Sequence, residues 1–482
     1  MSCNLRRRRT PTKGVDIAGT RRVTSAAAVG TADAPATAAG QAAPEPNEGG
    51  VFAALARPAF RNLWLAELLS QTALNAIWFA AIVATEKETH STTQISFTVV
   101  SAMLPVALFG VLAGLLVDRW NKKRVLLWST VLRVAISAGY LWYGRSIGVI
   151  FAMNFLINLV AQFFSPAMLA TIPLLLPKRL LTAATGLFNL TLNLSQILGM
   201  VLLGPPLIKL VGPGIVFALA SGIYVVATLF VVALPVDALP PPPRDRDAGR
   251  RPLARVRDEL REGWGFVRAD HRSWLAMLHL ALTWTILFVL ITLAPRYAAA
   301  RNGLRIESDD AVFVLAPAGL GMALAAGLLD KLTRRFGRWR LVSIGLVGLA
   351  LALAVLSGIA PIANWWVHSA FATRAARQSI HAEILVPRVF AVGLVALVAG
   401  WWVGIVTVTA EAVLLERAPA ALRGRVFALQ LTFTNLASVL PLLLVGGLAD
   451  LIGINAVILL TGIIVLLVWA ATASPFVRRP VD

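Results

Sequence analysis

Charged side chains inside long apolar runs are the first candidates for chemistry in this sequence. Arg133 lies nine residues into a run that begins near residue 124, and Glu67 and Glu411 lie inside two other runs. A charge near the centre of a bilayer costs at least about 2.5 to 3.5 kcal/mol, so such residues usually face a cavity or a partner. Arg133 therefore indicates either a functional charge, which attracts an anionic substrate or tunes a proton carrier, or a structural ion pair. Glu67 is the candidate proton carrier, and a solvated or paired carboxylate is the simpler alternative for both acids.

Side-chain amides form a second group of candidates, because they recur at helical spacing. One set lies at residues 154, 158 and 162, and another at 189, 193 and 196, so each set would occupy one face of a helix. Such a face could line a substrate cavity, or it could make hydrogen bonds between helices. The candidate coupling or cavity residues are Glu67, Gln71, Asn75, Arg133, Asn158, Gln162, Asn189 and Asn193.

Patterns that would support catalysis are missing from the sequence. The five histidines form no His-Glu-x-x-His pattern, and the single cysteine, Cys3, cannot build a thiolate metal site. No Gly-rich loop ends in Gly-Lys-Ser/Thr, so direct use of ATP is not indicated. We therefore expect no enzyme activity, no metal and no cofactor.

The elements that must position these residues are membrane helices. Hydrophobic residues make up 58% of the 482, charged residues only 14%, and the mean hydropathy is +0.75, whereas soluble domains carry about 25% charge. Continuous apolar runs exclude the alternating pattern of barrel strands, so we predict an all-α membrane protein with twelve transmembrane helices. The predicted spans lie at about 63–85, 95–117, 124–143, 147–170, 182–204, 214–234, 273–294, 311–329, 341–360, 391–412, 425–447 and 455–473.

The placement of Lys and Arg predicts the orientation of these spans. Most of the 44 basic residues lie in the terminal tails and the even-numbered loops, and the short loops alone show the same bias. The positive-inside rule then puts both termini in the cytoplasm of a multi-pass protein of the inner (plasma) membrane. The net charge of +20 follows from this placement, and we expect no nucleic-acid partner.

Two charged turns indicate an internal repeat. "GLLVDRWNKKRVLL" begins at Gly114 and follows the second span, and "GLLDKLTRRFGRWRLV" begins at Gly327 and follows the eighth. Each turn comes after the second span of a six-span half. Internal repeats of helices are typical of secondary transporters, whose substrate site lies between the repeats. The sequence therefore favours transport and two pseudo-symmetric six-helix bundles.

The first turn resembles the signature loop of the major facilitator superfamily, Gly-x-x-x-Asp-Arg-x-Gly-Arg/Lys-Lys/Arg. Other stretches are similar to its bacterial drug and siderophore efflux branch, the macrolide and enterobactin exporters: "FRNLWLAELLSQ", "FFSPAMLATIPLLLP", "REGWGFVRADHRSWL" and "ERAPAALRGRVFALQ". The resemblance covers residues 57–475 and implies the major facilitator fold. It also implies alternating access, export of a small amphipathic molecule such as a drug, macrolide or siderophore, and a proton gradient as the driving force. A lysolipid flippase and a non-transporting sensor are the alternatives.

The resemblance further implies that the two charged turns form a conformational latch. Contacts of such a latch exist in one state only, closing the cytoplasmic side until the protein opens inward. Asn121 stands where the signature has Gly, and we expect it to adopt the left-handed geometry that Asn tolerates. Ala73 and Leu74 stand where the branch commonly has Gly-Asp, which removes one acid associated with coupling. The latch candidates are Gly114, Asp118, Arg119, Lys122, Lys123, Arg124, Asp330, Arg334 and Arg335.

The predicted domains follow from these patterns. Residues 1–50 form a disordered basic cytoplasmic tail, 51–235 the first six-helix bundle, 236–272 a cytoplasmic linker with a surface helix, 273–475 the second bundle, and 476–482 a short cytoplasmic tail. Residues 361–390 form an unusually long outside loop that contains either an interfacial helix or a neutral insertion. We expect a monomer whose partners are a small-molecule substrate, protons and the lipid bilayer.

Overall fold

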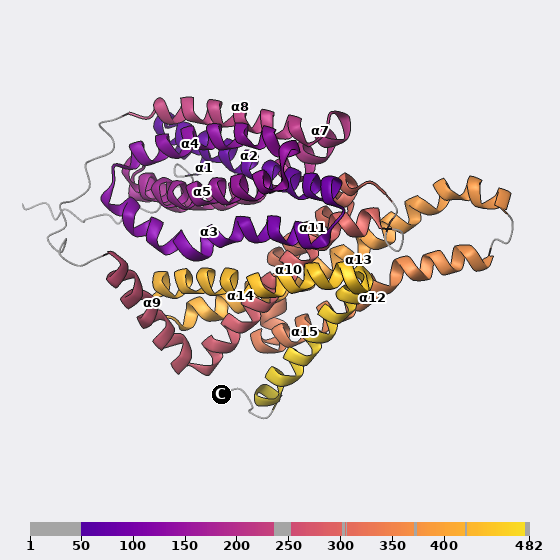
Figure 1. Cartoon of the computed structure of the whole chain (residues 1–482). Helices are drawn as coiled ribbons and strands as arrows, with labels where there is room; N and C mark the ends of the chain where they lie inside the picture. Colours follow the sequence, from indigo (N-terminus) through magenta and orange to yellow (C-terminus); the bar gives the residue numbers. More distant parts are fainter. Residues whose placement is uncertain are drawn as a thin grey trace, which may run out of the picture. The chain divides into compact units, whose positions relative to one another are not determined.

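The chain folds as a succession of helices, and no strand occurs among the residues that the structure describes (Figure 1). The computed structural model describes residues 50–235, 252–300, 304, 306–370, 374–419 and 422–477. Helices dominate because a bilayer offers no hydrogen-bond partners, so each spanning segment must satisfy its own backbone groups.

We call residues 50–235 the first half. Its helices are α1 (Val51–Leu55), α2 (Pro58–Thr89), α3 (Thr92–Arg119), α4 (Lys122–Gly139), η1 (Tyr140–Arg145), α5 (Ile147–Leu175), η2 (Lys178–Leu180), α6 (Leu181–Gln196), the π-helical segment η3 (Ile197–Leu203), α7 (Gly204–Leu210) and α8 (Pro213–Val232).

The helix α9 (Pro252–Ala269) follows residues 236–251, and we call residues 271–477 the second half. Its helices are α10 (His271–Ala299), η5 (Ser308–Ala311), α11 (Val312–Phe336), α12 (Arg338–Ala370), α13 (Arg374–Arg417), α14 (Arg423–Ile452) and α15 (Ile454–Val477).

Within the described part of the chain, twelve helical segments are long and apolar enough to cross a membrane, six in each half. They coincide with the twelve predicted spans, so the predicted all-α fold is confirmed. Several helices extend beyond the predicted apolar cores. For example, α2 begins at Pro58, and Pro is favoured in the first helical turn because its missing N–H would be unsatisfied there anyway.

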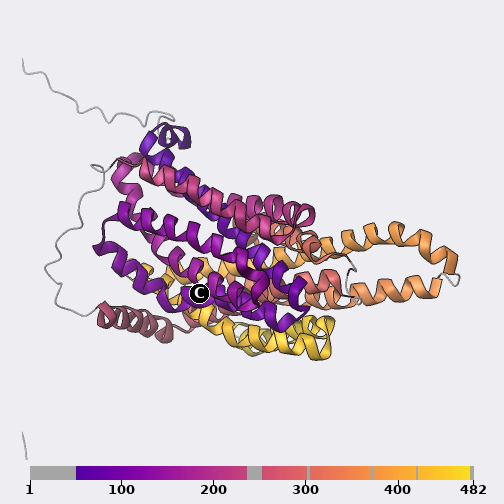
Figure 2. The ribbon, with the colours of Figure 1, turned by 45° about the horizontal axis from the view of Figure 1, so that its top comes forward.

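Two ends of the helices can be distinguished (Figures 1 and 2). The linker end carries α9 and the turns at residues 118–124, 334–338 and 416–425. The far end carries the turns at residues 86–93, 209–213, 296–311 and 450–454. Because α3 runs from the far end to the linker end and α14 runs the opposite way, these two helices pack against each other antiparallel.

The short turns use two different devices. Gly212, Gly337 and Gly453 have positive φ angles of 109°, 76° and 88°, which glycine adopts without steric cost. Asn121, in contrast, has φ −65° and ψ 116°, so the expected left-handed geometry is wrong. Its side-chain oxygen instead accepts a hydrogen bond from the backbone N–H of Arg124 at 3.1 Å, which caps α4 from an extended backbone.

The apolar core joins the two halves through the far ends of α2 and α3. Ile82, Ile95, Val99 and Met103 belong to one buried cluster with second-half residues such as Leu442. Towards the linker end, the clusters around Val117 and around Val413 are separate: the first contains only first-half residues, and the second contains only α9 and second-half residues. Burial of apolar side chains therefore holds the halves together at the far end.

The predicted outside loop is mostly helical backbone. Both α12 and α13 continue beyond the membrane-spanning length and project from the far end as a pair of arms, with residues 371–373 between them (Figures 1 and 2). The stretch contains no glycine, and its Ala, Arg, Glu, Ile and Leu residues favour helix over an irregular loop.

Some predicted segments fall outside the description. The tail over 1–50, apart from Gly50, the linker residues 236–251 and the last residues 478–482 lie outside the described residues. The side chains of residues 360–388 also lie outside them.

Candidate functional site

Two buried side chains of opposite charge lie inside the first half. Glu67 of α2 and Arg133 of α4 are both 0% exposed, and no hydrogen bond or ion pair between their side chains is described. Gln71, one turn along α2, donates a hydrogen bond from Nε2 to Glu67 Oε1 at 2.9 Å. This Glu67–Arg133 pair is the only one of the predicted cavity groups that combines complete burial with charge among the described residues.

Glu67 and Arg133 lie at similar distances from the starts of their helices. Both α2 and α4 start at the linker end, at Pro58 and Lys122. At 1.5 Å per residue, Glu67 is about 14 Å and Arg133 about 17 Å along its helix.

Aromatic rings surround the Arg133 guanidinium. Its central carbon lies 4.6 Å from the ring centroid of Phe164 and 5.7 Å from that of Tyr224, distances at which a cation is attracted to a ring face. No hydrogen bond to its three nitrogen atoms is found among the described residues, and the same holds for Glu67 Oε2 and the Tyr224 hydroxyl. Several buried polar atoms of the site therefore have no hydrogen-bond partner among the described residues.

The amides of α2 extend this site towards α6. Asn75 donates from Nδ2 to the Gln71 carbonyl at 2.9 Å and to Ser195 Oγ at 3.3 Å. Glu67, Gln71 and Asn75 therefore form one polar stripe along α2. Trp64 adds a second link between the same helices, through a 2.7 Å hydrogen bond from Nε1 to Thr191 Oγ1.

The amide face of α5 makes local contacts. Asn158 donates to the Asn154 carbonyl at 2.9 Å, and Gln162 donates to the Asn158 carbonyl at 3.2 Å, so both amides bond to their own helix. Asn154 is buried between the Tyr140 hydroxyl and the Thr98 carbonyl, where it ties α5 to α3. On α6, Asn193 is exposed, and the side chain of Asn189 lies outside the described residues.

The second half contributes fewer candidate charges. Glu411 on α13 is partly buried. Sequence reasoning missed His279 on α10, which is 3% exposed and lies 3.1 Å from Thr472 Oγ1 through Nε2. No motif marked this histidine, because its partner lies 193 residues away.

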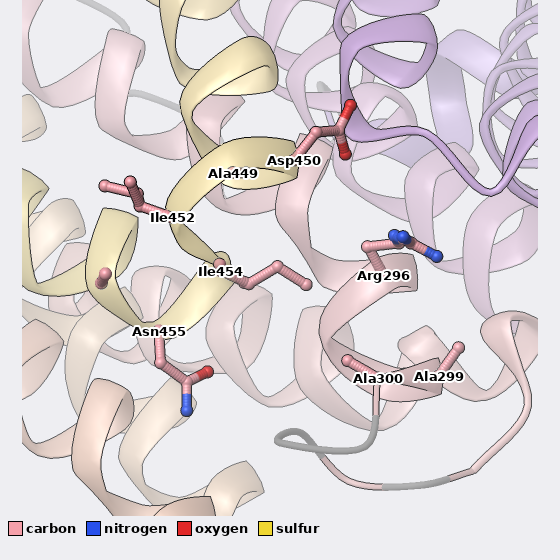
Figure 3. A pocket seen from close by; sticks show the side chains of 10 residues that line it. Arg296, Ala299, Ala300, Ala449, Asp450, Ile452, Ile454 and Asn455 are labelled. Atoms are coloured by element: carbon pink, nitrogen blue, oxygen red, sulfur yellow. The ribbon is translucent and has the colours of Figure 1, made fainter.

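Charged contacts between the halves gather at the far end. Asp450 at the end of α14 accepts hydrogen bonds from the first turn of α3, Lys209 lies 3.1 Å from Asp310, and Arg296 lies 3.4 Å from Glu86. All the hydrogen bonds and ion pairs that the structure describes between the two halves lie at this end. Beside them is a pocket of about 490 Å³ whose lining includes Arg296 and Asp450 (Figure 3).

The nine latch candidates lie at the linker end, where no bond of theirs to the other half is described. The Asp118 side chain is exposed, and so are those of Arg124, Asp330, Arg334 and Arg335. Lys122 donates to the carbonyls that end α3, including that of Asp118 at 2.6 Å, and Lys123 donates to the carbonyls of Val232 and Leu234. These lysines neutralise helix C-termini within the first half.

None of the ion pairs described at the linker end joins the first half to the second. Arg338 pairs with Glu416, Arg425 with Glu262 of α9, and Arg417 with Asp270 at 2.6 Å. Burial alone would raise the pKa of Asp270, but hydrogen bonds from Arg417 and Ser273 outweigh it and lower the pKa from 3.8 to about 2. The helix α9 is thereby fixed to the second half, and the cluster of Trp264, Trp274 and Phe433 supports it.

The chain matches the sequence profile of a known protein family. The profile of the Major Facilitator Superfamily matches residues 63–382. The enterobactin exporters EntS of Shigella boydii serotype 18 and of Escherichia coli O1:K1 are each 26% identical over 311 residues, which cover 63% of this chain and 71% of each exporter.

Solved structures share the fold. The nucleoside transporter NupG has a TM-score of 0.61 at 13% identity, over 87% of this chain and 99% of its own. A POT family transporter in complex with a thioalcohol conjugated peptide has a TM-score of 0.63 at 13% identity, over 87% and 96%. At this identity the likeness concerns the fold alone.

Proposed function

The chain belongs to the major facilitator superfamily, in the branch of siderophore and drug exporters, and on that premise we propose that it exports a small amphipathic molecule by proton-driven alternating access. Transport itself follows from the family and from twelve spanning helices. The direction, the class of substrate and the coupling ion are the proposed part.

The buried Glu67–Arg133 pair is the observation that carries proton coupling. Our proposal is that this carboxylate and this guanidinium, both fully buried, compensate each other's charge. Addition of a proton to Glu67 removes that compensation and leaves Arg133 as an uncompensated buried cation, which is costly in a low dielectric. The protonated and deprotonated states therefore favour different helix arrangements, which is what coupling requires.

The uneven distribution of contacts supports alternating access. The halves are bonded at the far end and make no described hydrogen bond or ion pair at the linker end. We infer that this arrangement is closed at the far end, and that the opposite state closes the linker end through Asp118 and the rest of the latch. The helices before and after α9 would then move as two bundles.

The positive-inside rule supports a cytoplasmic linker end. Exposed basic residues of both halves, including Arg124 and Arg334, lie there. Far-end closure then corresponds to a state open to the cytoplasm, from which an exporter loads its substrate. Both termini would be cytoplasmic, in a monomeric protein of the inner membrane.

Reconstitution into vesicles tests the proposal. Under an imposed pH gradient, wild type should move members of a panel of dyes, macrolides and enterobactin against their concentration gradients, and a protonophore should abolish this movement. Glu67→Gln should lose movement against a gradient while it keeps downhill exchange. Gradient-independent movement would contradict proton coupling, and movement of fluorescent lysolipid alone would assign a flippase instead.

A further inference from the structure

Asp450 makes the densest set of polar contacts between the halves. Its Oδ1 accepts a hydrogen bond from the Thr92 backbone N–H at 2.8 Å. Its Oδ2 accepts from the Ser91 hydroxyl at 2.8 Å, the Thr93 backbone N–H at 3.0 Å and the Thr93 hydroxyl at 2.8 Å. A carboxylate from α14 therefore caps the positive N-terminus of α3, where both the helix dipole and the free N–H groups favour an anion.

The sequence around Asp450 repeats the spacing of the signature turn. Gly446, Asp450 and Gly453 are spaced as Gly114, Asp118 and Asn121 are, at offsets of four and then three positions. One copy ends α14 at the far end, and the other ends α3 at the linker end. Because α3 and α14 are antiparallel neighbours, each acid lies at the C-terminal end of one helix, at the end of the molecule where the other helix begins.

The glycines of the two copies are in different situations. A Cβ on Gly446 would collide with the Ser96 hydroxyl and lie 2.9 Å from the Thr93 Cα, so α14 approaches α3 closely only because residue 446 lacks a side chain. A Cβ on Gly114 would meet nothing within 4 Å. The same glycine position is therefore in close contact at the far end and free at the linker end.

The helix N-termini show the same difference. The first turn of α3 is capped by its own Ser91, which accepts from the Gln94 N–H, as well as by Asp450. At the N-terminus of α14, Leu422 occupies the capping position and makes no side-chain cap. The α14 terminus, beside the linker end of α3, thus has the backbone donors that a carboxylate such as Asp118 could satisfy.

We propose that Asp450 is a second latch acid, which holds the far end closed as Asp118 is proposed to hold the linker end closed. The two acids act in turn, each capping the helix that carries the other, so closing one end accompanies release of the opposite end. Glu86–Arg296 and Lys209–Asp310 close the same end beside it. This inference rests on the proposed alternating access.

Labelling of a buried far-end position tests the latch. Val99 on α3 is 0% exposed and packs in the cluster shared by both halves, so Val99→Cys in a Cys3→Ser background should react slowly with a water-soluble maleimide. Adding Asp450→Asn removes the charge and one carboxylate acceptor, and should raise the labelling rate about tenfold. Adding Asp118→Asn should lower the rate, because the opposite state loses its cap.

Matched variants keep the test decisive. Asp258→Asn on α9 neutralises an acid with no described bond to the first half and should leave labelling unchanged. Thr93→Val removes one hydroxyl donor and should give a smaller increase than Asp450→Asn, which guards against a variant that simply unfolds. Unchanged or slower labelling in folded Asp450→Asn protein would overturn the latch. Labelling at one fixed pH reports the arrangement of the helices rather than transport, so the latch can hold even where the vesicle assay finds no proton-driven export.

Discussion

The central chemical question concerns one carboxylate and one guanidinium. Glu67 and Arg133 sit at similar depths on two helices that start at the same end, and Gln71 and Tyr224 complete their surroundings. The pair is buried among apolar side chains such as Phe164. In such surroundings each charge depends on the other, so a change at either residue should alter both stability and coupling.

Removal of the titratable group should make transport insensitive to protons. In Glu67→Gln, residue 67 can neither bind nor release a proton. Downhill exchange in vesicles should therefore become independent of pH over the physiological range, about pH 5.5 to 8. Glu411→Gln is the matched control, because it removes the partly buried acid of α13. A pH dependence that survives Glu67→Gln and disappears in Glu411→Gln would move coupling to the second half.

A double-mutant cycle should reveal the charge pair through stability. Arg133→Met leaves Glu67 as an isolated buried charge, and breaking a buried pair this way typically costs about 3 to 5 kcal/mol. Glu67→Gln/Arg133→Met removes both charges and should recover most of that loss, measured as the apparent unfolding temperature in detergent. Simple addition of the two single effects would show that these side chains do not interact.

Residue types were readable from the sequence, but their pairing was not. Glu67, Gln71 and Asn75 were each named as candidates, and their spacing by four, a local property, is what places them in one stripe along α2. The pairing with Arg133 depends on how α2 and α4 pack, which spacing does not encode. For the amide face of α5, the sequence left open a cavity lining or hydrogen bonds between helices. Asn154 follows the second alternative, because its side chain contacts Tyr140 and Thr98.

At the scale of the element, several of the charges discussed above lie at helix ends. Asp270 caps α10 by accepting from the Ser273 N–H at 3.1 Å, and it pairs with Arg417 at the end of α13. Asp118 and Asp450 end α3 and α14. Helix termini are suited to these roles because their free N–H and C=O groups are satisfied by charged side chains from other elements.

The Asp270 cap should make stability depend on acid. Its pKa is lowered to about 2, from 3.8, so its contribution is complete above about pH 4 and is lost as the pH falls through about 2. Wild type should therefore lose more stability over this range than Asp270→Asn, as followed by helical circular dichroism in detergent. Asp270→Ala removes the cap as well and should cost about 0.5 to 2 kcal/mol at neutral pH. Parallel acid curves for wild type and Asp270→Asn would refute the ion pair.

Neutralising the signature acid should stop transport without preventing folding. Asp118 is exposed and has no described hydrogen bond or ion pair through its carboxylate, so Asp118→Asn should be expressed and unfold like wild type. Transport in vesicles should fall about tenfold or more, because the state closed at the linker end loses its cap. Asp330→Asn, at the corresponding turn of the second half, gives the comparison. Normal transport by Asp118→Asn would leave the signature turn as a topology signal only.

Elements were more predictable than their ends. A run of about 20 apolar residues can cross a bilayer only as a helix, so all twelve spans were found. Helix within residues 361–390 was one of the two alternatives, but its continuity with α12 and α13 was not predicted, because hydropathy stops at the apolar core whereas helix propensity continues beyond it. The backbone conformation of Asn121 was predicted wrongly. Its side-chain oxygen accepts a hydrogen bond from the first turn of α4, and this cap requires an extended rather than a left-handed backbone.

At the scale of the whole molecule, function depends on contacts that join distant parts of the chain. Asp450 reaches Thr92 across 358 residues, and Arg296 reaches Glu86 across 210. No local pattern predicts such contacts, although the spacing of Gly446, Asp450 and Gly453 repeats that of the signature turn and could have marked the first. Under the proposed alternating access, the gathering of these bonds at one end lets the two halves separate there while they close at the other.

Orientation is the last prediction, and the distribution of charge decides it. If the linker end faces the cytoplasm, Arg334→Cys in a Cys3→Ser background should react with an impermeant maleimide only in inside-out vesicles. Ala375→Cys, on the projecting arm of α13, should react only from the outside of intact cells. Each position controls for the other, because a leaky membrane would label both from either side. Labelling of Arg334→Cys in intact cells would invert the topology, and with it the inference that the far-end latch faces outward.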